Sequence, residues 1–99
     1  MAREGKRIRA GHLELRWNAS LFHHPRVGLI VPKHGHMAVD RNRLKRRLRE
    51  IARVELLPRL PALDVVVRAR PTAYEASFDG LRDELTRAAE RLRAAAGAT

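Results

Sequence analysis

Apolar and polar residues alternate in the first part of the chain. Leu13, Leu15 and Trp17 are separated by polar side chains, and a period of two residues is typical of a half-buried strand. Residues 27–31 form a continuous apolar run that ends at Pro32. We predict a second strand over this run, in a more central position of the sheet.

Farther along the chain, the apolar period becomes that of a helix. One apolar residue recurs every three or four positions: Leu44, Leu48, Ile51 and Val54. This spacing predicts an amphipathic helix that begins near residue 39 and turns one stripe towards the core. Prolines at positions 58 and 61 end the helix.

The last part of the chain predicts one more strand and one more helix. The strand is LDVVVRAR, residues 63–70, and Pro71 bounds it. A second helical stripe of core residues follows Ser77, the predicted N-cap: Phe78, Leu81, Leu85, Ala88 and Leu92. The order β-β-α-β-α predicts an α+β fold, an α–β sandwich in which a small mixed sheet carries two helices. We expect residues 1–99 to form a single domain.

The net charge of the 99-residue chain is +10 at pH 7, and its distribution is uneven. All of the excess positive charge lies in residues 1–53, whereas residues 54–99 are neutral overall. A basic half beside a neutral half indicates a polyanion-binding surface on a neutral support.

The two predicted helices place their charges in opposite senses. A helix carries partial positive charge at its N-terminus and partial negative charge at its C-terminus. The second helix has its acids early and its arginines late, as this dipole favours. The first helix has Arg41, Arg43 and Lys45 early, and Glu50 and Glu55 late.

This inverted arrangement is costly for a helix that has no partner. Each misplaced charge costs about 0.3–1 kcal/mol at an exposed site, and each like-charge pair four residues apart costs roughly 0.2–0.5 kcal/mol. A polyanion would convert the penalty into binding free energy through phosphate contacts and counterion release. We therefore predict that the basic helix binds a polyanion.

Other chemistry finds little support in the sequence. The chain has no cysteine, and no apolar stretch approaches the roughly 20 residues that span a bilayer. We expect a cytoplasmic protein with neither a membrane nor a small-molecule partner. No acid lies beside a base suited to catalysis, so we assign no catalytic role to the acids of the basic half. Asp40, at the start of the basic helix, is predicted as an N-cap or as a partner of Arg43. The histidine pairs at positions 23/24 and 34/36 lie on separate loops, and we expect no metal site there.

The segment RVGLIVPKHGHMAVDRNRLKRR resembles the bacterial ribonuclease P protein, the small basic subunit of the ribonucleoprotein that processes precursor tRNA. The resemblance covers residues 5–92 and is strongest over residues 26–53. It rests on Arg26-Val27-Gly28, Lys33, Ala38-Val39, Arg41-Asn42-Arg43, Leu44 and Lys45-Arg46, and on Asp64, Ala69 and Arg70 in the later strand.

The resemblance implies an accessory role in removing the tRNA 5′ leader, with catalysis by the RNA subunit and its magnesium. No catalytic or metal-binding residue is then expected in this chain. The basic helix would bind the catalytic RNA through Arg41, Asn42, Arg43, Lys45, Arg46, Arg49 and Arg53. A cleft beside the sheet would bind the leader of precursor tRNA, for which we name Arg16, Arg26, Lys33, His34 and Arg70. The family's βαβ crossover is left-handed, which is the exception to a rule obeyed in about 98% of cases.

The chain departs from the family pattern around the leader cleft. The family usually begins with a further segment that contains a short helix. Only a few residues precede the first predicted strand, so we expect a short form without that helix. Arg16 stands where the family often has an aromatic residue, and Trp17 shares the core side of its strand. We therefore expect charge contacts to carry more of the leader binding.

Two other interpretations of the basic helix stay open at this point. The helix could serve a ribosomal or general structural RNA-binding protein that has no nuclease partner. A DNA-binding protein is disfavoured, because strands flank the basic helix and no helix-turn-helix pair is predicted.

Overall fold

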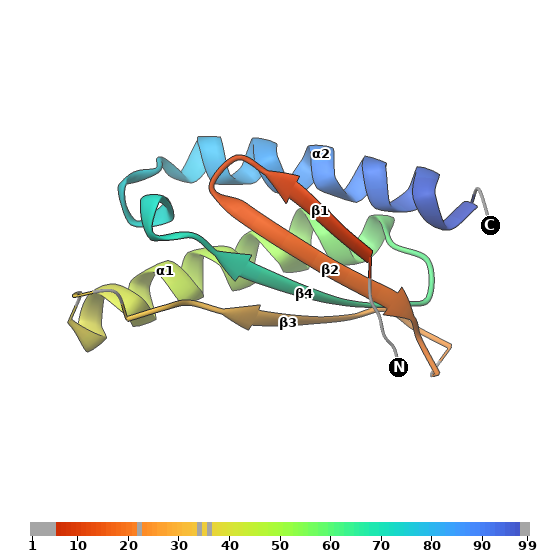
Figure 1. Cartoon of the computed structure of the whole chain (residues 1–99), viewed down its shortest axis with the longest axis horizontal. Helices are drawn as coiled ribbons and strands as arrows, with labels where there is room; N and C mark the ends of the chain where they lie inside the picture. Colours follow the sequence, from red (N-terminus) through yellow and green to blue (C-terminus); the bar gives the residue numbers. More distant parts are fainter. Residues whose placement is uncertain (1–5, 22, 34, 36, 98–99) are drawn as a thin grey trace.

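The computed structural model describes residues 6–21, 23–33, 35 and 37–97. Its strands are β1 (Lys6–Ala10), β2 (Leu13–Ala19), β3 (Arg26–Ile30) and β4 (Leu63–Ala69), and its helices are α1 (Ala38–Ile51) and α2 (Phe78–Gly97). A π-helical turn, η1 (Ala52–Leu56), and a 3-10 turn, η2 (Leu57–Arg59), follow α1, and a second 3-10 turn, η3 (Pro71–Glu75), precedes α2. Both helices lie on one side of the sheet (Figure 1). The predicted α+β class is confirmed.

The four strands form one mixed sheet in the order β1-β2-β4-β3. β2 is antiparallel to both β1 and β4, whereas β3 and β4 are parallel. β4 is central because the chain returns from α1 into the gap between β2 and β3. The prediction of a more central strand over residues 27–31 is therefore wrong, since β3 is an edge strand whose residues are at most half-buried.

The connection from β3 through α1 to β4 joins two neighbouring parallel strands. In Figure 1 both helices lie behind the sheet, β3 and β4 point the same way, and β4 lies above β3. Seen from the helix side with the strands pointing upward, β4 is to the left of β3, so the crossover is left-handed. About 98% of such crossovers are right-handed. The handedness implied by the family resemblance is confirmed.

β1 and β2 form a hairpin of which we predicted only the second strand. Ile8 is the sole buried residue of β1, so the strand carries little apolar signal. Gly11 turns the chain with φ +61°, in the left-handed region that favours glycine. Glu84 of α2 holds this turn, because its Oε1 accepts the backbone N–H of His12 at 2.9 Å.

The apolar stripe of α1 packs against the sheet over most of its predicted length. Leu44, Leu48 and Ile51 are buried as predicted, but Val54 is 48% exposed. The π-helical turn explains the difference, since its i→i+5 hydrogen bonds place one extra residue in the turn. Leu56, five residues after Ile51, then takes the inward position and is fully buried.

The stripe of α2 is also confirmed, with one exception at its first residue. The side-chain oxygen of Ser77 accepts the N–H of Gly80 at 2.9 Å, which confirms Ser77 as the N-cap. Phe78 was predicted in the core but is 39% exposed. It is the first residue of α2, and the buried stripe of the helix begins at Leu81. The core also contains Trp17, as predicted, and the buried residues Leu81, Leu85, Ala88 and Leu92.

The turn at Gly11 yields the first prediction. A Cβ atom at this position would lie 2.5 Å from Oε2 of Glu84, and a left-handed backbone costs a non-glycine residue roughly 1–2 kcal/mol. Gly11→Ala should therefore lower the free energy of unfolding by at least about 1–2 kcal/mol in urea titrations. Gly28→Ala is the matched control, because a Cβ at Gly28 meets nothing within 4 Å. Equal effects of the two substitutions would contradict this account.

Candidate nucleic-acid interface

The cations of α1 and η1 divide between two flanks of the helix. On the flank beside β3, four of them follow one another at intervals of four residues: Arg41, Lys45, Arg49 and Arg53. These four side chains border two adjoining hollows of about 390 and 260 Å³ between β3 and the helix. Asn42 borders the smaller of the two.

The opposite flank carries Arg43 and Arg47. Together with Asp40 and Tyr74 they border a hollow of about 240 Å³. The hydroxyl of Tyr74 donates to the backbone oxygen of Pro32 at 2.5 Å, which holds η3 to the segment that follows β3. Both flanks therefore rest on parts of the chain that packing and hydrogen bonds keep in place.

The start of α1 differs from the prediction. Met37 is the N-cap residue, and no side chain caps the helix. The backbone oxygen of Met37 accepts the N–H groups of Asp40 and Arg41, at 3.0 and 3.1 Å. Asp40 as N-cap is wrong because the helix begins two residues earlier, at Ala38. Asp40 instead lies in the first turn, where a carboxylate favours the helix dipole.

Most cations on this helix have no acidic partner among the residues that the structure describes. Arg53 pairs with Glu50 at 2.6 Å, and Arg59 of η2 pairs with Glu55 at 3.3 Å. Nε of Arg41 is buried without a hydrogen bond. Within the described part of the chain, no ion pair or side-chain hydrogen bond engages the following cations: Arg43, Lys45, Arg46, Arg47 and Arg49. This concentration of unneutralised charge suits contact with phosphates.

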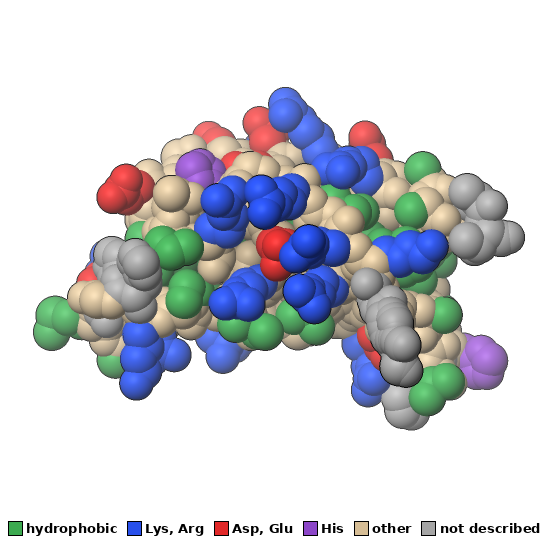
Figure 2. Space-filling model, viewed as in Figure 1, with side chains coloured by type: hydrophobic (Ala, Val, Ile, Leu, Met, Phe, Trp, Pro, Cys, Tyr) green, Lys and Arg blue, Asp and Glu red, His purple; other side chains and the backbone are tan. Residues whose placement is uncertain are grey.

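The face of the sheet that the helices leave uncovered, here called the open sheet face, is a second cationic surface. Figure 2 shows Lys and Arg side chains gathered over the strands on this face, around an acidic one. Strand register places two rows across it, first Arg9, Glu14, Arg68 and Ile30, then Arg7, Arg16, Val66 and Gly28. Glu14 pairs with Arg7 at 3.5 Å. A hollow of about 470 Å³ on this face is bordered by Arg7, Arg9, Arg16, Arg68 and Arg70.

The predicted leader-binding residues are only partly brought together. Arg16 and Arg70 border the hollow of the open sheet face. Pro32 also borders this hollow, and the exposed Lys33 is the next residue along the chain. Arg26 lies at the far end of β3, where it pairs with Asp64 at 2.9 Å. His34 lies outside the described residues.

Three arginines of the open sheet face escaped the sequence prediction: Arg7, Arg9 and Arg68. The alternation of side chains between the two faces of a strand could have suggested them. Arg7 and Arg9 flank the buried Ile8, and Arg68 lies between the buried Val67 and Ala69. Only the pairing of β2 with both β1 and β4 shows that these arginines share a face with Arg16.

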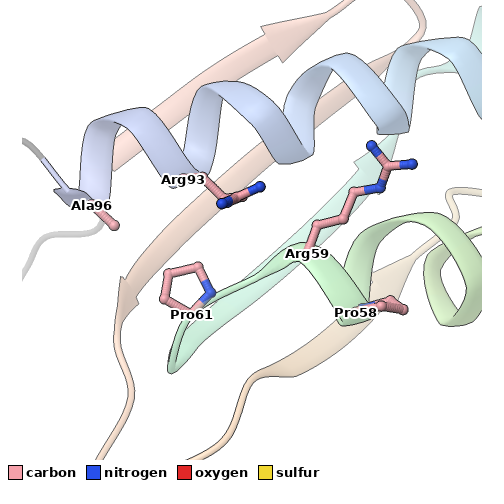
Figure 3. Close-up of a pocket in the computed structure, with 5 residues that line it drawn as sticks. All are labelled: Pro58, Arg59, Pro61, Arg93 and Ala96. Carbon is pink, nitrogen blue, oxygen red and sulfur yellow. The ribbon is translucent and has the colours of Figure 1, made fainter.

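A further hollow, of about 530 Å³, lies at the other end of the molecule, between the α1–β4 connection and the end of α2 (Figure 3). Arg59 and Arg93 border it together with Pro58, Pro61 and Ala96.

No helix among the described residues is long and apolar enough to cross a membrane. In the same part of the chain, no three His, Cys, Asp or Glu side chains gather into a group that could hold a metal ion.

The fold and its surfaces define a small, basic α+β protein built around a cationic crossover helix. The model of the family Ribonuclease P matches residues 1–93. The chain belongs to the ribonuclease P protein family.

Relatives within this family share sequence over most of the chain. The ribonuclease P protein component of Syntrophobacter fumaroxidans is 42% identical over 85 residues, covering 84% of this chain and 71% of the relative. The corresponding protein of Thermus oshimai is 43% identical over 89 residues, covering 90% of this chain but 56% of the relative. The chain thus spans between about half and about seven tenths of these relatives.

Solved structures with the same fold also carry this family name. The RNase P protein of Thermotoga maritima, in complex with 1-(4-fluorophenyl)-2-thiourea, superposes with a TM-score of 0.79 at 27% identity, covering 89% of this chain and 86% of that one. The RNase P protein of Staphylococcus aureus gives a TM-score of 0.75 at 26% identity, covering 93% and 81%.

The Arg26–Asp64 pair yields a prediction about pH. Nε and one terminal nitrogen of Arg26 donate to the two carboxylate oxygens of Asp64, at 2.9 and 3.1 Å. These hydrogen bonds lower the pKa of Asp64 below its ordinary value. A lowered pKa means stabilisation that is present above the ordinary value of about 3.9 and is lost as the pH falls through the folded-state pKa.

Asp64→Asn should therefore lower the urea midpoint at pH 7, and the difference from the unsubstituted protein should shrink as the pH falls towards 3. In an Arg26→Gln background, Asp64→Asn should have a much smaller effect, because the largest cause of the lowered Asp64 pKa is gone and only the weaker contributions of Ser20 and His24 remain. A constant difference across this pH range would show that the pair does not tie β3 to β4.

Proposed function

We propose that this chain is the RNA-binding subunit of a ribonuclease P ribonucleoprotein, which assists removal of the 5′ leader from precursor tRNA. The observation that carries the proposal is the group of cations on α1 that engage no acid among the described residues, in a chain that belongs to this family. The residues assigned to the catalytic RNA are Arg41, Asn42, Arg43, Lys45, Arg46, Arg49 and Arg53.

Arginine outnumbers lysine on this helix, and this difference supports contact with structured RNA. A guanidinium offers planar, paired donors that suit phosphates and base edges, whereas an ammonium acts as a point charge. Six of the seven basic residues between positions 41 and 53 are arginines. The helix thus offers directional hydrogen bonds as well as charge.

The open sheet face is the proposed path of the leader. Arg7, Arg9, Arg16, Arg68 and Arg70 surround its hollow, and the described residues there include no aromatic side chain on which a base could stack. Phosphate contacts are therefore expected to dominate over stacking, so leader binding should depend steeply on salt and little on base sequence.

The chemical step is assigned to the RNA subunit and the magnesium ions that it holds. Among the described residues, no set of side chains offers the oxygen and nitrogen ligands of a protein-held metal site. The contribution of this chain is to reduce repulsion between two polyanions and to position the leader. Both effects lie within binding and alignment, which the cationic surfaces can supply.

Neutralising the start of α1 tests RNA-subunit binding. Arg41→Gln/Arg43→Gln/Lys45→Gln should weaken binding to the cognate RNA subunit, and the slope of log affinity against log salt should fall by up to about 3, since each lost phosphate contact contributes about 0.7–0.9. Stimulation of leader cleavage at low magnesium should be lost in parallel. Filter binding and gel-based cleavage measure the two effects.

A control with equal loss of charge is Arg82→Gln/Arg87→Gln/Arg93→Gln on the exposed face of α2. It should change the salt slope far less, because these arginines lie outside the proposed interface. Unchanged affinity of the α1 variant for the RNA subunit, with its fold intact by circular dichroism, would refute the proposal.

The open sheet face gives a test in both directions. Arg16→Gln/Arg68→Gln should weaken binding of precursor tRNA to the holoenzyme several-fold and leave the affinity for mature tRNA unchanged, because only the precursor has a leader. Glu14→Gln removes the acid among these arginines and should strengthen precursor binding. Equal effects on precursor and mature tRNA would place the leader elsewhere.

A further inference from the structure

A groove between β3 and α1 has properties that general attraction to phosphate does not explain. It consists of the two adjoining hollows described above, and Leu29 and Lys45 border both of them. The two hollows therefore form one continuous feature, here called the β3–α1 groove.

The floor of the groove is apolar. Val27 and Leu29 of β3 and Leu57 of η2 are only half-buried, and Val27 and Leu29 pack against the buried core. The π-helical turn borders the same hollow through Ala52 and Arg53. Among the described strands, β3 pairs only with β4, so no other described strand covers the floor on that side.

One wall of the groove is a row of cations. Arg41, Lys45, Arg49 and Arg53 follow one another at intervals of four residues, which is a rise of about 6 Å per step along a helix. This step is close to the separation of successive phosphates in an extended single strand. Within the described residues, Lys45 and Arg49 have no acidic partner, and Arg53 pairs only with Glu50, on an exposed part of the helix.

We propose that the β3–α1 groove binds an unpaired, single-stranded segment of the RNA subunit, an inference that rests on the function proposed above. Phosphates of the segment lie along the cationic row, and its bases lie on Val27, Leu29 and Leu57. A base-paired helix does not fit this arrangement, because its bases are stacked inside and cannot reach an apolar floor beside the phosphates. Arg43 and Arg47, on the opposite flank of α1, are left to contact other parts of the RNA.

The β3–α1 groove and the open sheet face can be distinguished by nuclear magnetic resonance of methyl groups. Val27, Leu29 and Leu57 report on the groove, whereas Val66 lies on the open sheet face. A single-stranded oligouridylate of about eight nucleotides should shift the methyl signals of Val27, Leu29 and Leu57. An abasic strand of equal length should bind at least about tenfold more weakly at the groove and leave those signals nearly in place.

Two variants test the cationic row and the floor separately. Arg49→Gln should raise the Kd for oligouridylate at the groove about fivefold, whereas the matched Arg47→Gln should change it less than twofold. Leu57→Ser should reduce the preference for the intact strand over the abasic one and leave the salt dependence unchanged. If Leu57→Ser impairs folding, the comparison of Arg49→Gln with Arg47→Gln still decides the matter.

Several results would overturn the inference. These are shifts confined to Val66, equal shifts from a duplex of the same length, or equal shifts from a polyglutamate peptide, which would indicate a site for acidic protein segments. Binding of the wild-type chain to the RNA subunit is measured in parallel. If the chain binds the RNA subunit but the groove methyl signals do not shift with oligouridylate, this inference is wrong and the proposed function stands. If the groove signals shift but the chain does not bind the RNA subunit, the proposed function is wrong.

Discussion

The packing of α1 onto the sheet is the interaction on which the rest of the structure depends. Leu44, Leu48 and Ile51 are each at most 4% exposed, and burial of such a side chain contributes about 1.5–3 kcal/mol. This outweighs the roughly 0.2–0.5 kcal/mol that each like-charge pair on the helix costs. The apolar stripe therefore fixes the rotation of the helix, and the cations must occupy the faces that remain.

The sheet then separates two cationic surfaces. α1 covers one face with β3 as its neighbour, and the arginines of β1, β2 and β4 occupy the other. α1 contacts β3, the edge strand whose Ile30 and Gly28 stand at the ends of the two rows on the open sheet face. A chain with cations on both faces can lie between two polyanions and reduce their repulsion.

Patterns within a single helix were predictable, and the errors occurred where a helix begins or changes its hydrogen bonding. The stripes of α1 and α2 and the cap at Ser77 follow from local spacing. Val54 was wrongly predicted in the core because a π-helical turn shifts the helical register after Ile51. The local sequence pattern does not predict such a turn. Phe78 was misplaced because a stripe does not show where the core ends, and Asp40 because the helix starts earlier than its polar residues suggest.

The sequence by itself determined the uneven charge, the two amphipathic helices, the basic motif and the family to which they belong. These features depend on neighbouring residues, whose spacing is written along the chain. Only the tertiary structure decided that β3 is an edge strand, that Arg7, Arg9 and Arg68 share a face with Arg16, and that Arg26 is paired with Asp64. Strand order and register join residues that are distant along the chain, and the packing of the whole sheet selects among pairings that local spacing leaves equally acceptable.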